Sequence, residues 1–293
     1  GGYENHWRQF KPELQVLGFE ADEDECNRLN IENSAKLESH LPNALGEKNQ
    51  AGHFYLYKNQ PSSSFFPPND ALVQRFADYQ NLRIESSIEL RTSSLDELLL
   101  KQSVSEFDFL KMDAEGYELA ILKGATSALK KNIFGVQLEF AFLELRSGEA
   151  LFSEVVNFLK DYNFELFDLS TVRLGRRHFF DYPGPKPHGQ VVGGHALFFR
   201  DLCKKDIKEL DVPQNWDESK ILKLACCMEL YGLPDCASEL LLVATENGFF
   251  NKKEIKELVI KMQEEYRKEN SFSRKVLSKL NLAIRARLNP IGF

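Results

Sequence analysis

The chain has 293 residues, a formal net charge of −7 and 43% hydrophobic residues, enough for the core of one large domain or two ordinary ones. The negative charge argues against a general nucleic-acid-binding protein, because phosphate binding needs a basic surface. The five cysteines contain no C-x-x-C pair, so neither a disulfide framework nor a metal site is indicated. This cysteine usage favours a reducing, cytoplasmic setting.

No apolar run approaches the roughly 18 to 20 residues that a membrane span requires. The N-terminus also lacks the apolar core of a signal peptide. We therefore expect a soluble protein without stable membrane insertion.

Short β-type runs alternate with helical patterns from residue 14 to about 200, which is typical of a parallel sheet with helices on its faces. We expect a doubly wound α/β domain over residues 1–200, with six mostly parallel strands in its main sheet and residues 107–113 away from the sheet edge. The strand candidates are LQVLGFEA (14–21), the run ending in PNAL (42–45), FDFLKMD (107–113), GVQLEFAFL (135–143), FELFDL (164–169) and HALFFR (195–200). GHFYLYKN (52–59) also has the composition of a strand.

Two stretches have the apolar spacing of crossover helices: YELAILKGATSALKK (117–131) and SEVVNFLKDY (153–162), the second with Ser153 as a plausible N-cap. QPSSSFFPPND (60–70) is predicted to be a loop, since its prolines suit neither a helix nor a central strand. The glycine- and proline-rich tract 175–194 is also predicted to be a loop, and we interpret it as a lid over the site.

Beyond Asp201 the pattern is purely helical, which predicts a separate helical subdomain over residues 201–293. One helix is expected around 221–228, ending at Gly232, and a second around 237–244, ending near Gly248, with two more after them. The basic segment 272–288 suits an anionic surface, but the basic face of an ordinary terminal helix is the favoured interpretation.

Three stretches place acidic side chains where a doubly wound sheet is expected to bind its ligand, beyond the carboxyl ends of strands. Glu20 follows the first predicted strand, where a carboxylate can accept hydrogen bonds from both ribose hydroxyls of an adenosine cofactor. It lies 18 residues after Gly2, close to the spacing between a glycine loop and a ribose acid. The alternative is a charge at the start of a helix.

FDFLKMDAEGYE (107–118) ends an apolar strand in Asp113, Glu115 and Gly116. Gly116 permits a tight turn, while the two acids would project towards a cationic ligand. The alternative is that both acids cap the following helix.

Glu139 lies inside GVQLEFAFLELRSG, a run so apolar that its strand is expected to be central. Burial would raise the pKa of this carboxyl group, which suits a general base or a hydrogen-bonding anchor for an acceptor hydroxyl. The alternative is a core acid satisfied by the backbone or by an arginine. We expect Asp113, Glu115 and Glu139 to form one cluster.

DFLKMDAEGYELAILKGA resembles the D-x-E-G-x-E-x-x-x-L-x-G-A signature of FkbM-type methyltransferases. Further blocks agree with this family in chain order: GFEADEDECNRL, NALGEKNQAGHFYLYKNQPSSSFFPPN, and LFDL with HALFFR. The resemblance covers residues 1 to about 200. It implies a Rossmann-like class I methyltransferase fold and transfer of a methyl group from S-adenosylmethionine to a hydroxyl of a small molecule or glycan.

The resemblance also implies roles for individual residues. Glu20 would hold the ribose, and Asn43 and Ala44 would lie near the adenine. Asp113 would face the methionine part of S-adenosylmethionine, because carboxylates stabilise its cationic groups at short range. The acids Glu115 and Glu139 would lie towards the acceptor.

The chain departs from the family pattern at its beginning, where an apolar strand ending in D-x-G-A-N-x-G is expected. Gly1 and Gly2 are either the remnant of that glycine loop, and then part of the cofactor site, or a cloning scar or frayed end. This departure keeps a second hypothesis open, a catalytically degenerate fold that binds a protein partner through its C-terminal helices. An NAD-dependent dehydrogenase ranks last, because it has no use for the D-x-E-G turn.

Two further groups leave alternatives open. Each of the histidines His178, His188 and His195 is either a base or a solvent-facing or structural residue. The serines 62–64 either contact substrate or cofactor or belong to an ordinary polar loop.

Overall fold

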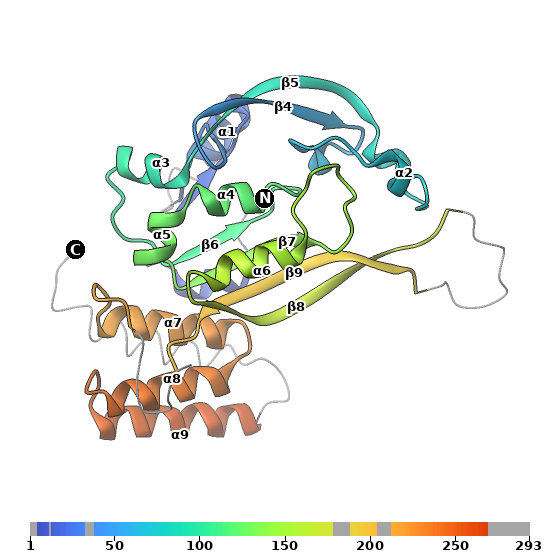
Figure 1. The fold of residues 1–293 in the computed structure, drawn as a ribbon. Coiled ribbons are helices and arrows are strands. Elements are labelled where there is room, and N and C mark those ends of the chain that lie inside the picture. Colours follow the sequence, from blue (N-terminus) through green and yellow to red (C-terminus); the bar gives the residue numbers. More distant parts are fainter. Residues whose placement is uncertain (1–4, 12, 33–37, 178–187, 204–211, 269–293) are drawn as a thin grey trace. The chain divides into compact units, whose positions relative to one another are not determined.

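The computed structural model describes residues 5–11, 13–32, 38–177, 188–203 and 212–268 (Figure 1). The chain forms two compact units. The larger unit is Leu17–Phe199, and the smaller one combines Gly1–Val16 with Arg200–Phe293.

The largest sheet has four strands in the order β6-β7-β9-β8. Strand β7 is parallel to β6 and antiparallel to β9. The bounds are β6 Phe109–Met112, β7 Gly135–Ala141, β8 Phe164–Leu174 and β9 Gln190–Arg200.

Two smaller sheets come from the first part of this unit. One pairs β1 with β2, and the other has the order β3-β5-β4, in which β5 is parallel to β3 and antiparallel to β4. The bounds are β1 Val16–Phe19, β2 Glu38–Leu41, β3 Ala44–Leu45, β4 Gln50–Tyr57 and β5 Ile84–Ser93.

The α-helices of the larger unit begin and end at local sequence signals. The Ser94 hydroxyl accepts a hydrogen bond from the Glu97 amide and caps α3, while the Asp96 carboxylate caps the start of α5. The bounds are α1 Glu23–Glu32, α2 Asp70–Val73, α3 Leu95–Lys101, α4 Glu118–Lys123, α5 Thr126–Lys131 and α6 Phe152–Lys160.

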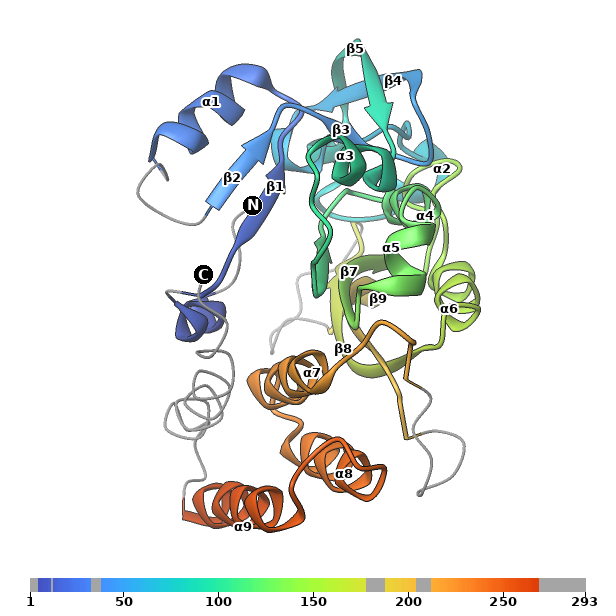
Figure 2. The ribbon, with the colours of Figure 1, turned by 90° about the vertical axis from the view of Figure 1, so that its left-hand side faces the viewer.

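The core of this unit lies between the four-stranded sheet and the helices α4, α5 and α6, which Figure 2 shows on one side of that sheet. Alternate residues of β7 point into this core. Leu122, Leu129, Leu138 and Leu159 are fully buried there. This packing fixes the carboxyl ends of β6 and β7, where the acidic side chains lie.

The segment between β4 and β5 contains a loop with short helical turns. Two of them are 3₁₀ helices, η2 (Gln60–Ser62) and η3 (Tyr79–Leu82), on either side of α2. The Asn69 amide donates a hydrogen bond to the Leu145 carbonyl, which ties this segment to the chain after β7.

The mixed α/β class is confirmed, but the expectation of six strands in one main sheet is wrong for the described residues. Strand β6 lies at the edge of its sheet rather than inside it. The division into separate sheets involves β5, a strand that we did not predict. Strand β5 pairs with both β3 and β4, so these three strands form a sheet separate from the four-stranded one. The predicted run ending at 42–45 is also interrupted: β2 ends at Leu41, and only Ala44 and Leu45 of PNAL form β3.

Two helix predictions need correction. The helix expected over 117–131 is broken at Gly124, because its backbone lies so close to the Gly46 carbonyl that a Cβ atom would be 2.0 Å from the oxygen. Helix α6 has Leu151 as its N-cap, and Ser153 is exposed inside its first turn. The Glu154 carboxylate, which accepts a hydrogen bond from the Leu151 amide at 2.9 Å, takes over the capping.

The tract 175–194 is not a loop throughout. Its last five residues belong to β9, where Gly194 lies so close to β8 that a Cβ atom would be 1.8 Å from the Ser170 carbonyl oxygen. Residues 178–187 lie outside the described chain, so the lid stays a prediction.

The described part of the smaller unit is helical. Trp7 in η1 (Asn5–Phe10) donates a hydrogen bond through Nε1 to the Tyr231 hydroxyl at 3.2 Å, which joins the N-terminal segment to the end of α7. The predicted glycine stops are confirmed, since Gly232 and Gly248 have positive φ and follow α7 and α8. The bounds are α7 Glu218–Leu230, α8 Pro234–Glu246 and α9 Lys252–Lys268.

The fourth helix expected in this unit, and with it the basic segment 272–288, lies outside the described residues. None of the described helices has both the length and the apolar character needed to cross a membrane.

The core predicts a stability difference between two leucines. Leu159→Ala should lower the free energy of unfolding by about 2–5 kcal/mol, because it leaves a cavity at a site with 0% exposure. The control Leu166→Ala should change it by less than about 1 kcal/mol, since that side chain is 43% exposed on β8. Urea unfolding of both variants measures this, and equal losses would contradict the assignment of the core.

Candidate functional site

The turn after β6 is conformationally unusual. Glu115 has φ +50° and Gly116 has φ +97°, so two consecutive residues adopt the left-handed region. Such a conformation costs little for glycine but about 1 kcal/mol or more for glutamate. The surrounding contacts must therefore hold Glu115 in place.

Glu139 lies at the neighbouring position of β7. Met112 pairs with Leu138 in the parallel register, so Asp113 and Glu139 come one position later on adjacent strands. Carboxylate oxygens of Asp113, Glu115 and Glu139 lie within 4.8 Å of one another. The expected cluster is confirmed, although Asp113 is exposed and Glu139 is half-buried rather than enclosed in the core.

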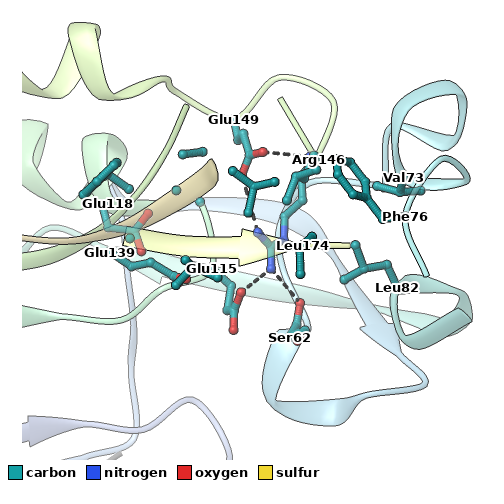
Figure 3. A pocket seen from close by; sticks show the side chains of 18 of the residues that line it. Ser62, Val73, Phe76, Leu82, Glu115, Glu118, Glu139, Arg146, Glu149 and Leu174 are labelled. Carbon is teal, nitrogen blue, oxygen red and sulfur yellow. Dashed lines mark hydrogen bonds and ion pairs between the residues drawn. The ribbon is translucent and has the colours of Figure 1, made fainter. Parts of the chain in front are cut away.

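An arginine that we did not predict organises these carboxylates. Arg146 follows β7, has an exposed fraction of 8%, and forms an ion pair through Nη2 with Glu115 (Figure 3). Its Nη1 lies 3.5 Å from the Glu149 carboxylate, and its Nη2 donates to the Ser62 carbonyl at 3.4 Å. Burial lowers the pKa of Arg146, but the carboxylates of Glu115 and Glu149 outweigh burial and raise it overall.

The loop that contains serines 62–64 also contacts the turn after β6. Ser64 is fully buried, and its hydroxyl donates a hydrogen bond to the Glu115 carbonyl at 2.7 Å. Ser63 accepts a hydrogen bond from the Tyr57 amide at 3.1 Å. These serines therefore position the acidic turn, a role that the loop composition alone did not indicate.

Burial controls the ionisation of the acidic residues. It raises the pKa of Glu115 to about 7, although the Arg146 guanidinium opposes this. It also raises the pKa of Glu139, with the Asp113 carboxylate as the next cause. Burial raises the pKa of Glu118 to about 8. Such carboxyl groups can bind or release a proton near neutral pH.

A cavity of about 260 Å³ opens beside this cluster. Figure 3 shows carboxylates at one end, Arg146 in the middle and apolar side chains at the other end. The acidic end includes Glu115, Glu118 and Glu139, and the apolar end includes Val73, Phe76, Leu82 and Leu174. An apolar pocket with a few convergent polar groups is the usual form of a small-molecule site.

The residues expected to hold adenosine form a second group. The Leu41 carbonyl accepts hydrogen bonds from the amides of Glu20 and Asn43, at 3.0 and 2.8 Å, so these residues lie side by side. Ala44 follows in β3. Among the described residues, Glu20, Asn43 and Ala44 do not line the cavity beside Arg146.

The remaining candidates are less well placed. Gly1, Gly2 and His178 lie outside the described residues. His188 is exposed outside a strand, whereas His195 is exposed on β9 directly opposite Glu139 in the antiparallel register. The His195 position therefore fits a contact with the cluster better than the His188 position does.

The three clustered carboxylates can stabilise a cation. An ammonium or sulfonium group would be held by short-range attraction, and the three oxygens are also close enough to coordinate a divalent metal ion. Arg146 already pairs with Glu115, so the exposed Asp113 is the carboxylate left to face such a ligand, with the half-buried Glu139 beside it.

The methyltransferase FkbM domain matches residues 6–166, just over half of the chain. The chain belongs to the FkbM methyltransferase family. Comparison with curated proteins and with solved structures gave no match.

Membership of the FkbM family indicates methyltransferase activity. The matched residues include the acidic turn, Glu139 and Arg146, so the cavity and its charged end belong largely to the family domain. The match ends within β8, whereas the sequence resemblance extended to about residue 200.

The buried Glu118 predicts a pH dependence of stability. The pKa of Glu118 is higher in the folded chain than in the unfolded chain, so its stabilising contribution is complete below pH 4.5 and is lost as the pH rises towards 8. Glu118→Gln keeps an oxygen for the Ala114 amide but cannot ionise. Between pH 5 and pH 8 the variant should therefore gain about 2–4 kcal/mol relative to the wild type.

Denaturant unfolding at several pH values measures this gain. The control is Glu154→Gln, which changes an exposed carboxylate that also accepts a backbone hydrogen bond. A parallel pH profile for Glu118→Gln and the wild type would contradict the raised pKa.

Proposed function

We propose that this FkbM-family chain transfers a methyl group from S-adenosylmethionine to a hydroxyl of a small molecule or glycan. The observation that carries the proposal is the carboxylate cluster of Asp113, Glu115 and Glu139 at the carboxyl ends of β6 and β7. Family membership supports the reaction class. The location that fits the cysteine usage is the cytoplasm.

The fold around the site supports the Rossmann-like, doubly wound arrangement that we propose for this domain. Strands β6 and β7 are parallel, and the helices α4 and α5 connect them. A parallel strand pair with a helical crossover is the unit from which doubly wound sheets are built. In such sheets the ligand binds beyond the carboxyl ends of the strands, which is where the cluster lies.

The proposed cofactor has two parts. Its methionine part would face Asp113, and its ribose would bind Glu20, whose backbone lies beside Asn43. The cationic sulfonium and ammonium groups fit the excess of carboxylates over guanidinium groups at the cluster. The cofactor supplies the methyl group, and the chain supplies alignment and proton acceptance.

The part of the proposed site that would bind the methyl acceptor has both a carboxyl group and a hydrogen-bond donor. The pKa of about 7 lets Glu115 accept a proton from an acceptor hydroxyl. Arg146 Nε is a buried donor with no partner among the described residues, and an oxygen of the acceptor would satisfy it. Glu139 is the second candidate base, because its pKa is also raised and it lines the same cavity.

The cofactor proposal is tested by calorimetry with the intact protein. S-adenosylmethionine should bind with micromolar affinity, and Glu20→Ala should weaken binding by about 1.5–3 kcal/mol, because charge-assisted hydrogen bonds to the ribose are lost. The control Glu23→Ala removes an exposed carboxylate three residues away and should leave the affinity unchanged. Absence of heat at high ligand concentration would favour the alternative, a binding module that uses its helical extension for a protein partner.

The catalytic proposal assigns different roles to Asp113, Glu115 and Glu139, so their variants should behave differently. Glu115→Gln or Glu139→Gln should lower turnover by roughly 10²- to 10⁴-fold while the affinity for S-adenosylmethionine stays nearly constant. Asp113→Asn should weaken both, because Asp113 is assigned to the cofactor. Release of demethylated cofactor in the presence of a panel of hydroxylated acceptors measures turnover. Unchanged turnover in both Gln variants would contradict a role for these acids as bases and would direct attention to His195.

A further inference from the structure

We propose that a second cavity beside the main one binds an anionic oxyacid group, a carboxylate or phosphate, carried by the acceptor molecule. The inference rests on the proposed function, since it assigns a chemical class to the substrate of that same site. It comes from two arginines that the catalytic proposal does not use, Arg83 and Arg177.

The second cavity adjoins the first. It has a volume of about 360 Å³, ample for an oxyacid group, and Val73, Tyr79 and Leu82 line both cavities. Figure 3 shows Val73 and Leu82 at the apolar end, away from the carboxylate cluster. The second cavity therefore adjoins the apolar end of the first, and the proposal places the acceptor across the residues that both cavities share.

Arg177 is held over this cavity by its backbone and its ring contact. Its amide donates a hydrogen bond to the Arg75 carbonyl at 3.0 Å, and its guanidinium lies 4.6 Å from the centre of the Tyr79 ring. A guanidinium stacked on an aromatic face keeps its edge donors available for an anion.

Arg83 directly follows η3, the short helix that begins at Tyr79. Its Nη1 donates to the Gln80 side chain at 3.3 Å, and its amide donates to the Gln80 carbonyl at 3.3 Å. These contacts orient the side chain while most of its five donors stay available.

The charges of the two arginines are not neutralised within the described part of the chain. Neither guanidinium forms a salt bridge there. Asp70 is the one carboxylate among the residues that line this cavity, so two positive charges face one negative charge. A guanidinium group with available donors binds carboxylate and phosphate oxygens in a bidentate manner, and two such groups line this cavity.

The whole site then has a consistent polarity. Carboxylates lie at the end proposed for the cationic cofactor, apolar walls lie in the middle, and cationic side chains lie at the far end. The acceptor that fits this order has an apolar body with a hydroxyl at one end and an oxyacid group at the other. A neutral sugar leaves the two arginines without a ligand.

The test uses defined probes and no cofactor. Methyl phosphate, n-hexyl phosphate, n-hexanoate and n-hexanol are titrated into the intact protein at constant ionic strength, and binding is followed by ligand-observed NMR. Hexyl phosphate should bind at least about tenfold more tightly than hexanol, because the arginines add charge-assisted hydrogen bonds. Hexyl phosphate should also bind at least about tenfold more tightly than methyl phosphate, because its chain covers the apolar wall. Comparison with hexanoate shows which oxyacid group is preferred.

Variants assign the effect to the two arginines. The double variant Arg83→Gln and Arg177→Gln should lose at least about tenfold in affinity for hexyl phosphate and keep its affinity for hexanol. The control Arg75→Gln removes the same charge from a neighbouring exposed arginine that lines neither cavity, and it should stay within about twofold of the wild type. Arg177→Lys keeps the charge but not the bidentate geometry, so it should give an intermediate affinity.

Three results would overturn the proposal: equal affinities for hexyl phosphate and hexanol, an unchanged affinity in the double variant, or equal affinities for methyl and hexyl phosphate. The last would show an anion site that is independent of the main cavity. Hexanol binding and the thermal unfolding of each variant show that it is folded. Because no S-adenosylmethionine is present, failure here is distinct from failure of the transferase proposal, which calorimetry with the cofactor decides.

Discussion

The buried guanidinium of Arg146 is the interaction on which the site depends. It pairs with Glu115, approaches Glu149 and donates to the Ser62 carbonyl, so it joins three segments of the chain around one charge. Removing one partner of such a buried network leaves an uncompensated charge, which is far more costly than losing an exposed pair. The same guanidinium lies at the boundary between the acidic and apolar ends of the cavity, where its Nε is proposed to donate a hydrogen bond to the acceptor.

Arg146 also explains how a strained residue is kept at the site. Glu115 has a positive φ, which a β-carbon disfavours, and the hydrogen bond from Ser64 together with the ion pair stabilises this conformation. Gly116 leaves room for the Glu149 carboxylate, since a Cβ atom there would lie 2.7 Å from its Oε2. The turn thereby directs a carboxyl group with a pKa near 7 into the cavity, the property that the catalytic proposal uses.

The polarity of the two adjoining cavities links cofactor and acceptor recognition. The proposed cation site is at Asp113, and the proposed anion site is at Arg83 and Arg177. Opposite charges at the two ends can orient a substrate before any chemistry takes place. Within the described larger unit, the acidic part of this arrangement comes from β6, β7 and the turn after β6. The proposed anion-binding part combines Arg83, from the segment between β4 and β5, with Arg177, which follows β8.

Sequence patterns correctly predicted the family, the mixed α/β class, most strands, and the clustering of Asp113, Glu115 and Glu139. These follow from local patterns, because parallel strands bring their carboxyl ends together. Strand β5 was missed because its largely exposed residues carry little apolar signal, although the even positions include Ile84, Ile88, Leu90 and Thr92. The sequence patterns did not predict the division into separate sheets or the place of Arg146, which contacts Glu115 across 31 residues and Ser62 across 84. Such long-range pairs depend on how loops fold back over a sheet, which no local spacing of residues encodes.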